Sequence, residues 1–190
     1  MQCLKNPLHA VEFKNITKSF GNFFANEDIS FAIRQNSVHC VLGENGAGKS
    51  TLMKMLFGIY RPDSGVIKVF DKEIKFDSPH DAIANKIGMV HQHFMLIDDF
   101  TVLENVILGN ELTKGLKIDF RDSEIILRSL IEKYSLGIDL HKKISELSIS
   151  QEQKVEILKL LFRNSEILIF DEPTAVLSPV EVTEFFRILQ

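Results

Sequence analysis

The amino-acid sequence predicts an α/β fold with a mostly parallel sheet core flanked by helices. Short apolar segments at residues 38–42 and 167–170 have the length and composition of buried strands, and helical patterns follow them. Residues 11–16 and 27–33 alternate apolar and polar side chains, as strands with one buried face do. A largely helical section begins at Thr101, so strands bracket a helical middle section.

Turn and capping residues predict the other elements. Residues 66–70 and 74–76 form a predicted hairpin pair after a turn. A helix is predicted after Ser78, because a serine cap, a proline at the first helical position and an early acid are typical of a helix start. Thr101 and Glu104 predict a capping box for the next helix. The remaining elements are a strand at 87–90 and helices at 122–134, at 150–162 and from 178 onward.

Composition and charge favour one globular, cytosolic domain. The chain has 190 residues, 45% hydrophobic and 25% charged, which is enough for a substantial core. A net charge of −4 argues against an electrostatic nucleic-acid binder. No apolar run approaches the roughly 20 residues of a membrane-spanning helix, and no secretory signal is recognisable. Cys3 and Cys40 form no framework, so Cys40 is expected to be a reduced thiol in the core.

Residues 43–50 fit the pattern G-x-x-x-x-G-K-[ST] of a phosphate-binding P-loop, between a predicted strand and a predicted helix. Glycines let the backbone fold around an anion, and the loop N–H groups and the helix N-terminus then point at phosphates. Lys49 is expected to reach the β- and γ-phosphates, and the Ser50 hydroxyl to bind Mg²⁺. A chance glycine-rich turn is the alternative. The predicted nucleotide-binding residues of the loop are Gly43, Glu44, Asn45, Gly46, Ala47, Gly48, Lys49, Ser50 and Thr51.

The apolar strand at 167–170 ends in two carboxylates, Asp171 and Glu172. Ligands bind at the carboxyl ends of strands in a parallel α/β sheet. Asp171 is therefore expected to hold the Mg²⁺ shell, and Glu172 to orient or polarise an attacking water. Two solvated acids at a strand end are the alternative, which the P-loop makes the weaker one.

From about Val11 onward, these motifs and their order resemble the nucleotide-binding domain of ABC transporters. Residues 43–51 resemble Walker A, and residues 167–172 resemble Walker B with its catalytic glutamate. Gln92 matches the Q-loop glutamine, and residues 147–151 stand where the LSGGQ signature belongs. Pro-Thr-Ala after Walker B also continues as the family does, and Phe20 falls where an aromatic side chain stacks on adenine.

The resemblance implies a P-loop NTPase fold with an N-terminal antiparallel β subdomain and an inserted helical subdomain. The ATP-binding domain would span residues 5–190 and would be incomplete at its C-terminal end. The β subdomain and P-loop core would occupy residues 1–92, the helical subdomain residues 93–150, and the return to the core with Walker B residues 151–190.

The resemblance also implies a mechanism in which two domains close around two ATP molecules. Ser148 would contact the γ-phosphate of the opposite domain in trans. Glu172 and Gln92 would be the catalytic residues, and Ser50, Gln92 and Asp171 would hold Mg²⁺. ATP and Mg²⁺ are therefore the expected substrate and cofactor.

Details of residues 91–96, 155–158 and 175–179 resemble the importers of nucleosides and simple sugars. This branch implies a second ATP-binding domain, in tandem or as a dimer, and transmembrane permease subunits. A solute-binding protein would be an indirect partner, and nucleic acid is not an expected one. The chain would lie on the cytoplasmic face of the cell membrane, attached peripherally through the permease.

Departures from the family pattern leave alternatives open. Ser150 occupies the position of the second signature glycine, Ser178 replaces an acid common in the D-loop, and no histidine follows Glu172. The chain is thus expected to be a fragment or a truncated product. The alternatives are a nucleotide-binding module without effective hydrolysis and a non-transport ABC ATPase.

Some residues carry weaker expectations. Phe20 as the adenine platform competes with Phe23 and Phe24, which are alternatively core residues. His91 and His93 are an incomplete set for a metal. The apolar residues 94–97 suit either a groove for a permease helix or core packing.

Overall fold

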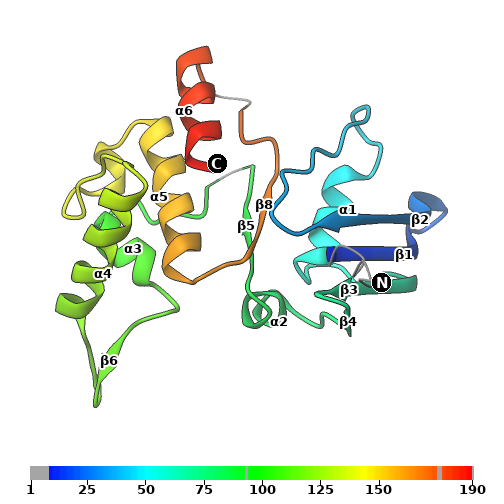
Figure 1. The fold of residues 1–190 in the computed structure, drawn as a ribbon, viewed down its shortest axis with the longest axis horizontal. Coiled ribbons are helices and arrows are strands. Elements are labelled where there is room, and N and C mark those ends of the chain that lie inside the picture. Colours follow the sequence, from blue (N-terminus) through cyan, green and yellow to red (C-terminus); the bar gives the residue numbers. More distant parts are fainter. Residues whose placement is uncertain (1–8, 93, 175–176, 190) are drawn as a thin grey trace, which may run out of the picture. The chain divides into compact units, whose positions relative to one another are not determined.

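The computed structural model describes residues 9–92, 94–174 and 177–189 (Figure 1). The chain divides into two compact units, of which the first ends at Ile87 and the second begins at Gly88. Each unit has its own secondary structure and its own buried side chains.

A four-stranded antiparallel sheet dominates the first unit. Its strands, in the order β2-β1-β3-β4, are β1 (His9–Phe20), β2 (Phe23–Arg34), β3 (Ser64–Val69) and β4 (Lys72–Ile74). Phe13 on β1 lies opposite Phe31 on β2 and Ile67 on β3. A register shift between Phe13 and Ile16 lets both side chains be buried although they are three positions apart. The N-terminal antiparallel sheet is therefore confirmed.

Two short helices complete the first unit. Helix α1 (Lys49–Leu56) follows the P-loop and buries Leu52, Met55 and Leu56. Helix α2 (Pro79–Ala84) starts as predicted, because Ser78 donates its backbone N–H to the Asp81 carboxylate over 2.9 Å.

The second unit is mostly helical. Strands β5 (Ile87–Val90) and β8 (Ile167–Phe170) form a two-stranded sheet, and β6 (Thr113–Lys114) pairs with β7 (Lys117–Ile118). The helices of this unit are α3 (Val102–Ile107), α4 (Phe120–Lys133), α5 (Ile149–Phe162) and α6 (Pro179–Leu189), with a 3-10 turn at Ile144–Glu146. These bounds lie within two residues of the predicted ones at 122–134, 150–162 and from 178. Within the described residues, no helix is both long enough and apolar enough to cross a bilayer.

Helices α3, α4 and α5 pack around one apolar core. Val106 from α3, Leu127 from α4 and Leu158 from α5 are fully buried within it. The Thr101 hydroxyl accepts the N–H of Glu104, so the predicted capping box is confirmed at the start of α3. This core holds α5, whose N-cap is the candidate site residue Ser148.

The strand predicted at residues 38–42 is wrong for this structure. The segment is irregular, and Val38 and Leu42 are 71% and 86% exposed. Cys40 is exposed as well, so its predicted place in the core is also wrong. A strand needs a neighbour for its N–H and C=O groups, and the described sheets include no partner for this segment. Its apolar composition alone does not satisfy those groups.

Candidate functional site

The predicted phosphate-binding loop leads directly into α1 in the first unit. Gly46 and Gly48 have φ angles of 85° and 83°, in the left-handed region that favours glycine. A Cβ on Gly48 would lie 2.0 Å from the carbonyl oxygen of Ala25, whereas a Cβ on Gly46 would meet nothing within 4 Å. Gly48 is also the N-cap of α1 and brings no capping side chain to the helix N-terminus. Glycine at positions 46 and 48 thus leaves the loop without side chains at these two positions, so that its backbone can approach a ligand.

Lys49 lies across this loop. Its ammonium donates to the carbonyl oxygens of Gly43 and Glu44, each over 2.8 Å. These bonds occupy two of the three donors of an ammonium group. The positive end of α1 and this ammonium therefore favour an anion at the same end of the helix. Ser50 lies in the first turn of α1, where its hydroxyl provides the hard oxygen ligand that Mg²⁺ prefers.

The proposed adenine platform is an exposed aromatic group at the tip of the β1–β2 hairpin. Phe20 is 46% exposed, and its ring lies 5.3 Å from the ring of Tyr60 in an edge-on arrangement. Phe23 and Phe24 are 61% and 55% exposed, so the alternative that places them in the core is wrong. Exposure thus does not separate Phe20 from its two competitors, and its assignment rests on position in the motif order.

A cation is held beside the Phe20 ring. The Lys18 ammonium lies 5.6 Å from the ring centroid and donates to Asp63 over 2.7 Å. Hydrogen bonds from the Lys18 side chain and from Ser19 lower the pKa of Asp63 to about 2. Asp63 therefore remains ionised at neutral pH and orients Lys18.

In the second unit, β5 and β8 bring three predicted residues together. The Asp171 N–H donates to the Val90 carbonyl oxygen over 3.2 Å, so the two strands end side by side. The Gln92 side-chain amide then donates to the Glu172 carboxylate over 3.1 Å. Glu172 has a φ of 52°, a left-handed conformation that is uncommon for a residue with a side chain. Such backbone geometry often accompanies functional positions.

The predicted signature residues begin α5. Ser148 is the N-cap, and its backbone N–H donates to the Gln151 side chain over 3.0 Å. Ser150, the second residue of α5, contacts Glu181 in the first turn of α6. Hydrogen bonds from the backbone N–H and the hydroxyl of Ser178, and a smaller one from Ser150, lower the pKa of Glu181. The Ser150 hydroxyl thus has a partner within its own unit.

The candidate residues form two groups. Phe20 and the loop residues 43–51 belong to the first unit, whereas Gln92, Ser148, Asp171 and Glu172 belong to the second. The structure brings Gln92 and Glu172 into contact, and Asp171, which directly precedes Glu172, bonds through its N–H to Val90 at the end of β5. Ser148 lies at the start of a different element, α5.

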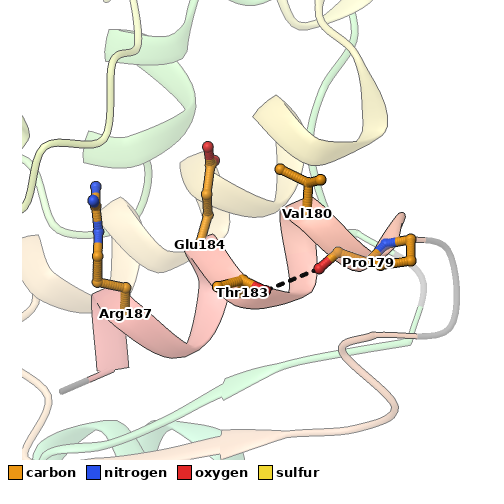
Figure 2. A pocket seen from close by; sticks show the side chains of 5 residues that line it. All are labelled: Pro179, Val180, Thr183, Glu184 and Arg187. Carbon is orange, nitrogen blue, oxygen red and sulfur yellow. Dashed lines mark hydrogen bonds between the residues drawn. The ribbon is translucent and has the colours of Figure 1, made fainter.

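One open hollow lies elsewhere. Its lining residues, Pro179, Val180, Thr183, Glu184 and Arg187, all come from α6 (Figure 2). The Thr183 hydroxyl in it donates to the Pro179 carbonyl oxygen over 3.0 Å. Because it lies along one helix and contains no predicted site residue, it does not mark the nucleotide site.

In the part of the chain that the structure describes, no three His, Cys, Asp or Glu residues form a metal cluster, and His93 lies outside that part.

Three polar residues of α5 have contacts that residue spacing does not predict. Gln153 and Glu156 are buried, and Lys159 is half-buried beside Glu156. They bind backbone groups that follow Glu172 and Gln92 in the chain. The only sequence signal for them is the occurrence of polar residues within a largely apolar helix.

A family model for the ABC transporter family matches residues 26–175 of the chain. Among curated proteins, one of Mycoplasma pneumoniae, provisionally named a carbohydrate transport ATP-binding protein, is 51% identical over 193 residues. The nucleoside import ATP-binding protein NupA of Lactococcus lactis subsp. cremoris is 48% identical, and the guanosine import ATP-binding protein NupO of Bacillus subtilis is 45% identical. These alignments cover 95%, 95% and 96% of this chain but only 34%, 36% and 36% of the relatives. The chain therefore spans about a third of their length.

Solved structures give the same picture of the fold. A nucleotide-free ATP-binding cassette from an ABC transporter superposes with a TM-score of 0.83 at 26% identity, over 96% of this chain and 76% of that one. The ADP conformation of an ATP-binding cassette superposes with a TM-score of 0.83 at 27% identity and the same coverage. The α/β P-loop fold class predicted from the sequence is thus confirmed.

Proposed function

Because this chain belongs to the ABC transporter family, we propose that it is the ATP-binding part of a subunit that hydrolyses ATP to energise a membrane importer. We infer nucleosides or simple sugars as the solute class from the names of the relatives. The observation that carries the proposal is the hydrogen bond between Gln92 and Glu172 at the ends of β5 and β8. In this hydrogen bond the Gln92 amide orients the Glu172 carboxylate, which would polarise the attacking water.

In this proposal the P-loop holds the phosphates of ATP. Backbone N–H groups of residues 43–51 bind the phosphate oxygens, and the Lys49 ammonium moves from the loop carbonyls to the β- and γ-phosphates. Ser50, Gln92 and Asp171 would hold Mg²⁺, and their hydroxyl, amide and carboxylate oxygens are the ligand types that this ion prefers. The bound ion neutralises charge on the phosphates. Phe20 supports the adenine ring.

Glu172 is the proposed general base. Its carboxylate accepts a proton from the attacking water, while the Gln92 amide fixes the carboxylate and contacts the γ-phosphate region. Preorganised donors and cations around the transferred phosphoryl group lower the barrier because little reorganisation is needed during the reaction.

The family membership supports further proposals for the assembly. Residues 5–190 form one ATP-binding domain, with parts at 1–92, 93–150 and 151–190. It pairs with a second such domain, in tandem or as a dimer, and Ser148 contacts the nucleotide of that domain in trans. Transmembrane permease subunits hold the pair on the cytoplasmic face of the membrane and receive solute from a binding protein.

Calorimetric titration of the full-length protein with ATP and Mg²⁺ tests the nucleotide site. Lys49→Ala should weaken ATP binding by about 100-fold or more, because a charge-assisted contact to phosphate is lost. Lys54→Ala, in the same helix, removes an equal charge away from the loop and should leave affinity within about threefold. Equal affinities for all three proteins would refute the P-loop assignment. ATP binding without phosphate release above the Lys49→Ala level would favour the binding-module alternative.

A further inference from the structure

Gln153 is a buried polar side chain on α5, with 3% of its surface exposed. Its amide donates to the carbonyl oxygen of Pro173 over 2.7 Å. Pro173 directly follows Glu172, whose backbone is left-handed. This bond therefore holds the carbonyl group of Pro173, the residue after Glu172, against α5.

Glu156 is a second buried polar side chain on α5, with 5% of its surface exposed, and it binds the segment that follows Gln92. Its carboxylate accepts the Met95 N–H over 3.0 Å, and the neighbouring Lys159 ammonium donates to the Met95 carbonyl oxygen over 3.2 Å. The two charged groups lie 3.9 Å apart. Burial lowers the pKa of Lys159, and the Glu156 carboxylate opposes that shift. Both polar groups of the Met95 backbone are thus bound by one helix.

Through these contacts, α5 binds both the segment that follows Gln92 and the segment that follows Glu172. Met95 lies three positions after Gln92, and Pro173 lies one position after Glu172. Gln92 and Glu172 contact each other, and the helix that binds both segments has Ser148 as its N-cap. A shift of α5 would therefore pull on both sides of the Gln92–Glu172 contact.

We propose that Gln153 and Glu156 are positioning residues that set the geometry of the Gln92–Glu172 pair from α5. The inference rests on the proposed hydrolytic function of that pair. Neither residue contacts substrate; each acts through a backbone group of the segment that it binds. A displacement of about 1 Å at a reacting group can cost on the order of 100-fold in rate, so the expected effect is on turnover and not on ATP affinity.

A purely structural role is the competing explanation, because a buried polar group that loses its hydrogen-bond partner destabilises a protein. Ser123 offers a matched control. It is fully buried on α4, its hydroxyl donates to the Asp119 carbonyl oxygen over 2.7 Å, and it touches neither segment. Ser123→Ala should therefore leave turnover per folded molecule unchanged, whatever its effect on stability.

The experiment measures the ATP dissociation constant and kcat of the full-length protein with its permease. For each variant, both values are expressed per folded molecule. Gln153→Met and Glu156→Met keep volume and remove the polar contact, whereas Glu156→Gln keeps an acceptor for the Met95 N–H. The Met variants should lower kcat about 10- to 100-fold with ATP affinity within about threefold, and Glu156→Gln should restore most of the rate. If Glu156→Met does not fold, Gln153→Met alone carries the test.

A second background separates positioning from stability. In Gln92→Ala the pair is already broken, so Gln153→Met should cause less than about a threefold further loss of kcat. If Gln153→Met lowers kcat as much in the Gln92→Ala protein as in wild type, the inference is overturned. Unchanged kcat in the folded Met variants would overturn it as well, and both results would leave the proposed function intact. A wild-type protein with no turnover above Lys49→Ala would remove the proposed function, and the inference with it.

Discussion

The sharpest test of the P-loop geometry is a comparison of two glycine substitutions in one loop. Gly46 and Gly48 have nearly the same φ angle, 85° and 83°, so alanine carries the same backbone penalty at both positions. Their surroundings differ. A Cβ at position 48 would lie 2.0 Å from the Ala25 carbonyl oxygen, and a Cβ at position 46 would lie in open space. The two variants therefore separate conformational strain from steric overlap.

The magnitudes follow from these two terms. A left-handed alanine costs about 1–2 kcal/mol, which is the whole expected effect of Gly46→Ala. In Gly48→Ala the backbone of β2 and the start of α1 must also separate by about 1 Å, and overpacking of this kind adds about 1–3 kcal/mol. Gly48→Ala should therefore destabilise the first unit by about 2–5 kcal/mol. It should also weaken ATP binding more than Gly46→Ala, because it moves the loop that would hold the phosphates.

Hydrogen exchange of peptides from α1 and β2, read by mass spectrometry in the full-length protein, reports the stability of this unit by itself. ATP affinity is measured on the same samples by calorimetry. We expect faster exchange in Gly48→Ala than in Gly46→Ala, with wild type slowest. Indistinguishable exchange and affinity for the two variants would refute the argument that the Ala25 carbonyl requires glycine at position 48.

Two further predictions concern the first unit's ion pair and the second unit's core. The pKa of Asp63 falls from 3.8 to about 2 on folding, so its stabilising effect is complete above about pH 4 and is lost as pH falls toward 2. Asp63→Asn should therefore be less stable than wild type in urea at pH 7. The difference in unfolding free energy between the two proteins should narrow toward pH 3, and an unchanged difference would contradict the lowered pKa of Asp63. Leu127→Ala should cost about 2–5 kcal/mol because its side chain is fully buried. Ile126→Ala, at a position 42% exposed on the same helix, should cost less than about 1 kcal/mol, and equal losses in denaturant unfolding would refute the core assignment.

Local chemistry made several elements predictable from sequence. The caps at Ser78 and Thr101 depend on residues three positions away, so their pattern is visible in the chain. The P-loop glycines are predictable for the same reason, because their function depends on a fixed spacing. The family's motif order names Gln92 and Glu172 as catalytic residues, but their contact was not predicted, because 80 positions separate them in the chain.

Other features depend on distant partners and were not predictable. Residues 38–42 have the composition of a strand, but composition does not supply a neighbouring strand. Phe23 and Phe24 are apolar but lie exposed at a hairpin tip, where turn geometry rather than hydrophobicity sets their position. Glu156 is charged and would be expected on a solvated face, yet it is buried because Met95 and Lys159 satisfy it.

Phosphate release by the full-length protein, measured together with ATP affinity, tests whether Glu172 and Gln92 form a hydrolytic pair. We expect wild type to release phosphate. Glu172→Gln should bind ATP with an affinity within about threefold of wild type but release phosphate only at the Lys49→Ala rate. Turnover retained by Glu172→Gln, or absent from the wild-type protein, would contradict the assignment of Glu172 and Gln92 as the hydrolytic pair.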